Sequence, residues 1–269
     1  MVRENNELEE YIANHFVRQE QQDYNEDFIN QWQDWLMFCD FPEILNDKIC
    51  CERPVKFENP EKIIIEIYES IAGNIPVIVF DRDADFENFV VNAVYNGVRP
   101  DNIQQMGSSF IYGRTQRFIA LSKKYYSNTS PEFVRLSPDE WREKSMIIRR
   151  EHECTHYYKK RFYGSASNNI HDELIADFFG IYAAFGHYEA RLFKHFMGID
   201  GINHEGRLSL YTEGLSQEVR DVIAELAGQC ADSLEAWSKS RGFLAMDKAS
   251  RINYLCETCI MKLANSDMI

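Results

Sequence analysis

The stretch 137–177, SPDEWREKSMIIRREHECTHYYKKRFYGSASNNIHDELIAD, decides how this chain folds. Ser137, a proline at the next position and Glu140 form a capping box, which predicts that a helix begins here. No Gly or Pro interrupts the sequence up to Tyr163, and Gly164 supplies a stop. The stretch therefore predicts one long helix, then a short turn, then a second helix.

The long helix contains the motif HECTH at residues 152–156, which is an HExxH pattern. Residues four apart on a helix project from the same face, so the imidazoles of His152 and His156 are both able to reach one metal ion. Glu153 follows the first histidine and is placed to polarise a water bound to that metal. The motif predicts a metal-binding helix that carries its own general base.

Two carboxylates follow the motif at short range. Glu173 and Asp177 are again four apart and share a face of the second helix, for which Asn168 or Asn169 is the expected cap. Two histidines and one glutamate form a ligand set that leaves the fourth position of a catalytic zinc ion open to water. Asp177 is placed to accept a hydrogen bond from the far nitrogen of a ligand histidine.

HExxH followed by Glu-x-x-x-Asp, here ELIAD at 173–177, resembles the gluzincin clan of zinc metallopeptidases, which includes the thermolysin-like enzymes. Residues 152–177 carry this resemblance, about a tenth of the chain. It implies a zincin-like fold and one Zn²⁺ per chain. The implied roles are zinc ligands for His152, His156 and Glu173, general base for Glu153, and support of His152 for Asp177.

The metzincin pattern is excluded, because the six residues after His156 read YYKKRF and lack its Gly and third His. Enzymes of the gluzincin clan also use a Tyr, His or Arg to stabilise the oxyanion of the tetrahedral intermediate. The sequence does not select among the candidates, which are Tyr158, Tyr163, His187, Arg191 and His204.

The expected function is that of a hydrolase, a metalloprotease in which a metal-activated water attacks the peptide bond while Glu153 takes its proton. One alternative is a non-catalytic binding or regulatory module that retains the metallopeptidase scaffold. Another is an interaction protein with a structural zinc ion, whose fourth position would be closed by Cys154 or His171. The intact set of three ligands, base and supporting aspartate favours the enzyme.

The composition limits the partners that we expect. The chain has 269 residues, a formal net charge of −14 and a pI near 5.0, which argues against nucleic acid as the main partner. The first residues lack the apolar core of a signal peptide, and no run approaches the roughly 18 apolar residues that span a bilayer. Seven cysteines, an odd number, fit reduced thiols. We expect a cytoplasmic protein with no membrane partner that acts on a peptide or protein.

The fold class predicted from these patterns is α+β, predominantly helical, with one small β-sheet next to the HExxH helix. We expect an acidic helical N-terminal segment over 1–60 and a zincin-like catalytic domain over 61–269. That domain would consist of a strand-bearing lobe, 61–136, and a metal-binding and C-terminal helical lobe, 137–269.

Several shorter elements are predicted around the motif. Helices are expected over 4–39 with a break near 23–25, over 61–71, over 85–95, and almost throughout the chain after Gly180. Residues 75–80 read as a buried strand, and 110–112 with 117–121 as a hairpin. In the enzymes that the motif resembles, a sheet edge just before the metal helix pairs with the substrate backbone.

Overall fold

The computed structural model describes residues 2–13, 16–20, 26–113, 116–165, 169–203 and 206–265. The chain divides into two compact units, one formed by 22–157 and the other by 1–21 together with 158–269. The domain limits predicted from the sequence lie at residues 60 and 136 instead. Those two limits stay predictions. The limit after residue 157 lies inside the longest helix, α6 (Pro138–Tyr163).

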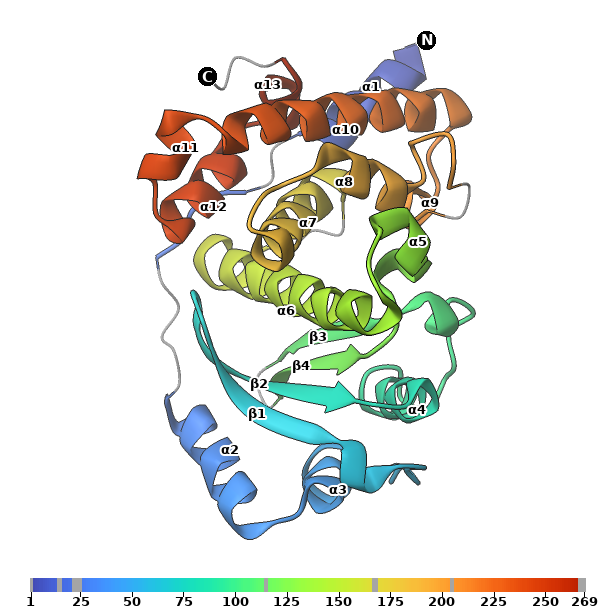
Figure 1. Cartoon of the computed structure of the whole chain (residues 1–269), viewed down its shortest axis with the longest axis vertical. Coiled ribbons are helices and arrows are strands. Elements are labelled where there is room, and N and C mark those ends of the chain that lie inside the picture. The colour runs from blue at the N-terminus through green and yellow to red at the C-terminus, as the bar shows by residue number, and fades with distance from the viewer. Residues whose placement is uncertain are drawn as a thin grey trace. The chain divides into compact units, whose positions relative to one another are not determined.

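A mixed β-sheet is the centre of the unit 22–157 (Figure 1). Within its described residues four strands pair in the order β1-β2-β4-β3, with β2 and β4 parallel and the two outer pairs antiparallel. Together with the helices, this sheet confirms the α+β class and the expected hairpin. The strands are β1 (Ile64–Ser70), β2 (Gly73–Phe80), β3 (Ser108–Tyr112) and β4 (Arg117–Ser122).

The two faces of the sheet are covered by different helices (Figure 1). On one face, Phe80 and Phe118 join a buried core with Trp32 of α2 (Glu26–Phe38) and Phe89 of α4 (Asp83–Ala93). On the other face lies α6, whose Tyr157 packs against aromatic rings of β3 at centroid distances of 6.0 Å. Strand residues alternate between the faces, so β3 presents every second side chain to the HExxH helix.

The prediction of a helix over 61–71 is wrong, because most of this stretch forms strand β1. Its sequence IIEIYES starts with β-branched residues, and Ile65, which is buried, alternates with Ile64, which is 48% exposed. This alternation places one apolar row on the core face. Pairing with β2 along the whole strand, from Ile64↔Val79 to Ser70↔Gly73, then outweighs any local helical preference.

The two helices that carry the motif residues begin where the sequence predicts, and the first also ends there. Ser137 and Glu140 form the expected capping box, in which the Glu140 carboxylate accepts the Ser137 backbone N–H at 2.9 Å. α6 ends before Gly164, which has a φ of +69°. The next helix, α7 (Ile170–Phe185), is capped by Asn169, whose side chain accepts from Asp172 N at 2.9 Å. Asn168 and the expected break at 23–25 lie outside the described residues.

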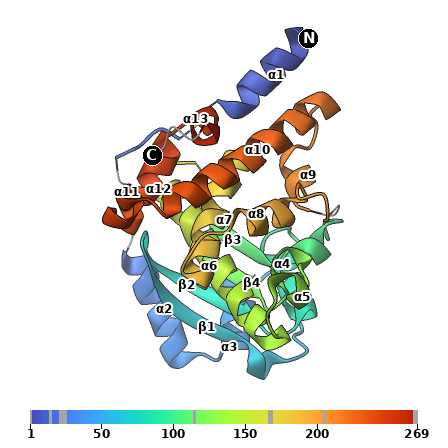
Figure 2. The ribbon, with the colours of Figure 1, turned by 45° about the horizontal axis from the view of Figure 1, so that its top comes forward.

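The unit 1–21 with 158–269 is helical in its described parts (Figure 2). Its longest helix, α10, contacts α1, α7, α8, α11 and α13. Aromatic rings of Phe178, Trp237 and Phe243 meet in its core at centroid distances of 4.8–5.9 Å. The remaining helices of this unit are α1 (Val2–Ile12), α8 (Ala190–Met197), α9 (Leu208–Tyr211), α10 (Gln217–Ser238), α11 (Arg241–Ala245), α12 (Lys248–Glu257) and α13 (Ile260–Ala264).

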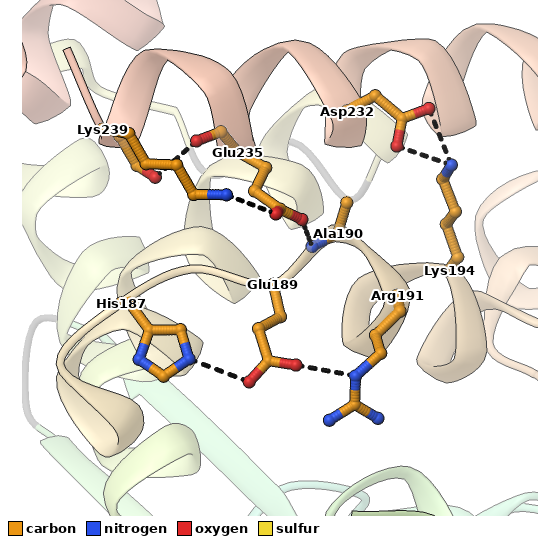
Figure 3. A network of polar contacts seen from close by, with 9 residues as sticks. His187, Glu189, Ala190, Arg191, Lys194, Asp232, Glu235 and Lys239 are labelled. Atoms are coloured by element: carbon orange, nitrogen blue, oxygen red, sulfur yellow. Dashed lines mark hydrogen bonds and ion pairs between the residues drawn. The ribbon is translucent and has the colours of Figure 1, made fainter.

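Polar contacts join α8 to α10 at the surface of this unit (Figure 3). Lys194 pairs with Asp232 at 2.7 Å, and the carboxylate of Glu235 accepts the backbone N–H of Ala190 at 2.8 Å. This second contact satisfies an N–H group in the first turn of α8. Among the helices that the structure describes, none combines the length and the apolar character needed to cross a membrane.

Candidate metal centre

His152 and His156 lie side by side on α6, as the spacing of the motif predicts. Their Nε2 atoms are 3.0 Å apart, and the two residues are 5% and 8% exposed. Two nitrogen atoms that bind one tetrahedral zinc ion lie about 3.3 Å apart, given Zn–N bonds of about 2.0–2.1 Å. The two imidazoles therefore converge at a spacing close to the one that a shared metal ion requires.

The far nitrogen of His152 meets a residue that the sequence analysis did not single out. The hydroxyl of Tyr126 lies 3.1 Å from His152 Nδ1, and Tyr126 is buried. The backbone N–H of Tyr126 donates to Ser145 of α6 at 2.9 Å, which fixes the tyrosine against the same helix. A metal bound at Nε2 leaves the proton on Nδ1, and the oxygen of Tyr126 is then its acceptor. No spacing rule links Tyr126 to the motif, because 26 residues separate it from His152.

Glu153, the expected general base, is buried at 7% exposure beside the sheet. Its Oε1 accepts a hydrogen bond of 2.6 Å from the hydroxyl of Ser108, the first residue of β3. β3 is an edge strand of the sheet. The contact therefore joins the carboxylate of the motif to the expected hairpin, in which the resemblance implies that a sheet edge pairs with the substrate backbone.

Glu173 and Asp177 are buried on α7, at 2% and 0% exposure. Arg207, which directly precedes α9, makes an ion pair with each, with its Nη2 on Asp177 and its Nη1 3.6 Å from Glu173 Oε2. Arg207 could not be recognised from the sequence, since a single arginine 30 residues after Asp177 forms no pattern. The expected hydrogen bond between Asp177 and His152 stays a prediction.

Tyr211 of α9 completes the surroundings of Glu173. Its hydroxyl lies 3.4 Å from Arg207 Nη1. Burial raises the pKa of Tyr211 well above its ordinary value, and the negative charge of Glu173 raises it further. The hydroxyl therefore stays protonated at neutral pH and is able to donate to the carboxylate of Glu173.

The three expected ligands come together. His152, His156 and Glu173 each offer one ligand atom, and these atoms all lie within 4.8 Å of one another. All three residues are buried. Two imidazoles and one carboxylate are a donor set found at catalytic zinc sites, where a water completes the tetrahedron. The chemistry and the close approach of these groups both fit a bound zinc ion.

The candidates for the oxyanion-stabilising residue have other contacts. Tyr158 and Tyr163 both donate to the side-chain oxygen of Asn253, at 3.1 Å and 2.9 Å. His187 and Arg191 both contact Glu189 near the start of α8, as Figure 3 shows. His204 lies outside the described residues. The structure thus gives each described candidate a partner elsewhere in the unit 1–21 with 158–269.

The two residues considered as a fourth ligand are also buried. His171 has its Nε2 3.2 Å from the carbonyl oxygen of Leu255, and its ring packs edge-on against Phe16. These contacts give His171 a structural role in the packing of α7 and α12. Cys154 is 1% exposed.

A cavity of about 840 Å³ lies at the carboxyl ends of β2 and β4 in the unit 22–157. Its walls are charged, and opposite charges pair within them: Lys123 with Asp81 and Lys124 with Glu87, both at 2.8 Å. The lining comes from residues other than the HExxH motif. The cavity is therefore distinct from the histidine pair.

The comparisons with known proteins identify a family for this chain. The model of a family of unknown function (DUF7005) matches residues 44–116 and 114–267. These ranges include both helices of the metal centre. No curated protein and no solved structure matches the chain.

Proposed function

The chain belongs to this family of unknown function, and we propose that it is a zinc-dependent peptidase of the gluzincin type. The observation that carries the proposal is the group formed by His152, His156 and Glu173, whose ligand atoms lie within 4.8 Å of one another. Glu153 lies on the same helix as the two histidines and would act as the general base. A hydrolytic zinc site needs such a base, whereas a structural zinc site does not.

When bound, zinc supplies a water of lowered pKa and polarises the carbonyl of the scissile bond. The residues of the chain would hold and move the protons. Tyr126 keeps the proton of His152 on Nδ1, so that Nε2 is unprotonated and able to act as a ligand. Glu153 takes a proton from the attacking water and delivers it to the leaving amine, and Ser108 holds its Oε1 in place through the 2.6 Å hydrogen bond.

Strand β3 is the proposed binding edge for the substrate. Among the described strands it lies at an edge of the sheet and pairs with β4, and we propose that an extended peptide pairs with its other side. Because Ser108 of β3 contacts Glu153, a peptide paired with β3 would run past the proposed base. The cytoplasm as the place of this activity stays a proposal, which rests on the odd number of cysteines.

The test is cleavage of a mixed peptide library by the zinc-loaded protein, read by mass spectrometry. Glu153→Gln should reduce the rate by about 10²–10⁴-fold, the contribution of a general base, and leave the zinc content unchanged. Glu151→Gln is the matched control, because Glu151 is an equally buried neighbour that accepts from Tyr68 at 2.5 Å. Equal cleavage by the Glu153 variant and the unchanged protein would refute the proposal.

A further inference from the structure

A fully buried ion pair joins α6 to α7. Lys159 and Asp172 have side chains that are 0% and 1% exposed. The ammonium group of Lys159 contacts the carboxylate Oδ1 of Asp172 and also donates to its backbone carbonyl oxygen at 2.7 Å. Burying two charges carries a large desolvation cost, and apolar residues of similar volume often stabilise a protein as well or better. Stability alone is therefore a weak explanation for this pair.

The position of the pair suggests another role. Lys159 follows His156 by three residues and thus lies on the neighbouring turn of α6. Asp172 directly precedes Glu173 and lies in the first turn of α7, where the side chain of Asn169 accepts its backbone N–H. The pair therefore ties the turn of α6 next to one proposed ligand to the residue beside another.

The geometry of the contact fixes one register between the helices. A slip of α7 by one residue would move its side chains by 1.5 Å along the axis and rotate them by about 100°. Apolar burial is non-directional, so apolar side chains can form new contacts after such a slip. The ammonium group of Lys159, in contrast, contacts both the carboxylate and the backbone oxygen of Asp172, which requires one arrangement of the helices. Any slip would leave a buried charge without its counterpart.

We propose that Lys159 and Asp172 are positioning residues, which set the register of α7 on α6 and thereby the approach of Glu173 to His156. This proposal rests on the proposed zinc site. The pair touches neither the metal nor the substrate, and its effect passes through the backbone of Asp172 to the carboxylate of Glu173.

The test compares zinc affinity and folding in a variant in which both partners become apolar, Lys159→Met with Asp172→Leu. We expect the dissociation constant for zinc, measured by competition with a chelator, to rise about 10- to 100-fold, as for other residues that orient metal ligands. The unfolding midpoint of the metal-free variant should stay close to that of the unchanged protein. With Co²⁺ in place of zinc, the visible absorption spectrum should change, because the position of Glu173 changes.

The matched control is Lys194→Met with Asp232→Leu. This pair has the same residue types and an Nζ–Oδ1 distance of 2.7 Å, but it joins α8 to α10 and its side chains are 26% and 65% exposed (Figure 3). Its zinc affinity and Co²⁺ spectrum should match those of the unchanged protein. If the apolar variant of Lys159 and Asp172 does not fold, Lys159→Gln with Asp172→Asn keeps polar side chains without charge and serves for the same comparison.

Two results would overturn the proposal, and they differ in what else they refute. If the folded variant binds zinc within threefold of the unchanged protein and has the same Co²⁺ spectrum, the pair has a purely structural role and the proposed function stands. If the unchanged protein itself binds no zinc, the proposed function fails and this inference fails with it.

Discussion

On α6, His152 and Glu153 contact the neutral hydroxyl groups of Tyr126 and Ser108, whereas on α7 the carboxylates of Glu173 and Asp177 face the charged guanidinium of Arg207. The difference follows from the chemistry of the groups. A metal-binding imidazole is neutral and needs an acceptor for its one remaining proton. Glu173 and Asp177 place two charged carboxylates at 2% and 0% exposure, and burying both is costly unless a cation lies beside them. Glu153 is a single carboxylate at 7% exposure, which accepts from the hydroxyl of Ser108.

Removing the cation beside the carboxylates of α7 should therefore affect folding, while removing either hydroxyl group beside His152 and Glu153 should affect metal binding or catalysis. The loss of a cation leaves buried charges without compensation. The loss of a neutral hydroxyl removes a single hydrogen bond, which contributes about 1 kcal/mol to stability.

Arg207→Met should lower the free energy of unfolding of the metal-free protein by about 3 kcal/mol, because two buried carboxylates lose their shared cation. Urea unfolding followed by circular dichroism measures the change. Arg191→Met is the control, since Arg191 pairs with Glu189 at the surface and such pairs contribute about 0–1 kcal/mol. Equal losses of unfolding free energy in the two variants would mean that Arg207 does not compensate the buried charges of α7.

Tyr126→Phe should weaken zinc binding about tenfold with a small effect on folding, because it removes the acceptor for the His152 proton and leaves the aromatic packing in place. Calorimetric titration of the metal-free protein with zinc measures this change. Tyr125→Phe, the same substitution one residue earlier, is the control. A zinc affinity that stays unchanged in Tyr126→Phe would mean that the 3.1 Å contact does not orient His152.

Ser108→Ala should have the smallest effect, a fall of about fivefold in the rate of peptide cleavage, which corresponds to one hydrogen bond of about 1 kcal/mol. Zinc content should not change, since Ser108 contacts the base and not a ligand. Ser109→Ala, at the next position of β3, is the control. A loss of zinc from the Ser108 variant would place Ser108 among the residues that support the metal, and would contradict its assignment to Glu153.

The same contrast explains how much of the molecule could be predicted from the sequence. The capping box at Ser137 and Glu140 and the cap at Asn169 are local signals, and both helices begin as predicted. The convergence of His152 and His156 follows from helical geometry alone. Strand β1 was not predicted because it is stabilised by pairing with β2, which a local sequence pattern does not reveal.

The supporting residues of the site could not be predicted for a related reason. The contacts come from separate parts of the chain: Tyr126 precedes α6, Ser108 begins β3 and Arg207 precedes α9. No rule relates the sequence position of these residues to that of the groups they contact. Lys159 and Asp172 flank the motif residues, yet a lysine and an aspartate on helices are usually exposed. Their burial depends on how α6 and α7 pack, which the sequence pattern does not specify.

We propose that His152, His156 and Glu173 together bind one zinc ion. The most direct measurement is the metal content of the purified, untagged protein by elemental mass spectrometry, beside His156→Ala and, as a control, His187→Ala, which changes an exposed histidine. We predict about one zinc ion per chain in the unchanged protein and in the control, and none in His156→Ala. A protein that holds no zinc after addition of the ion at neutral pH, or that keeps it without His156, would contradict the account.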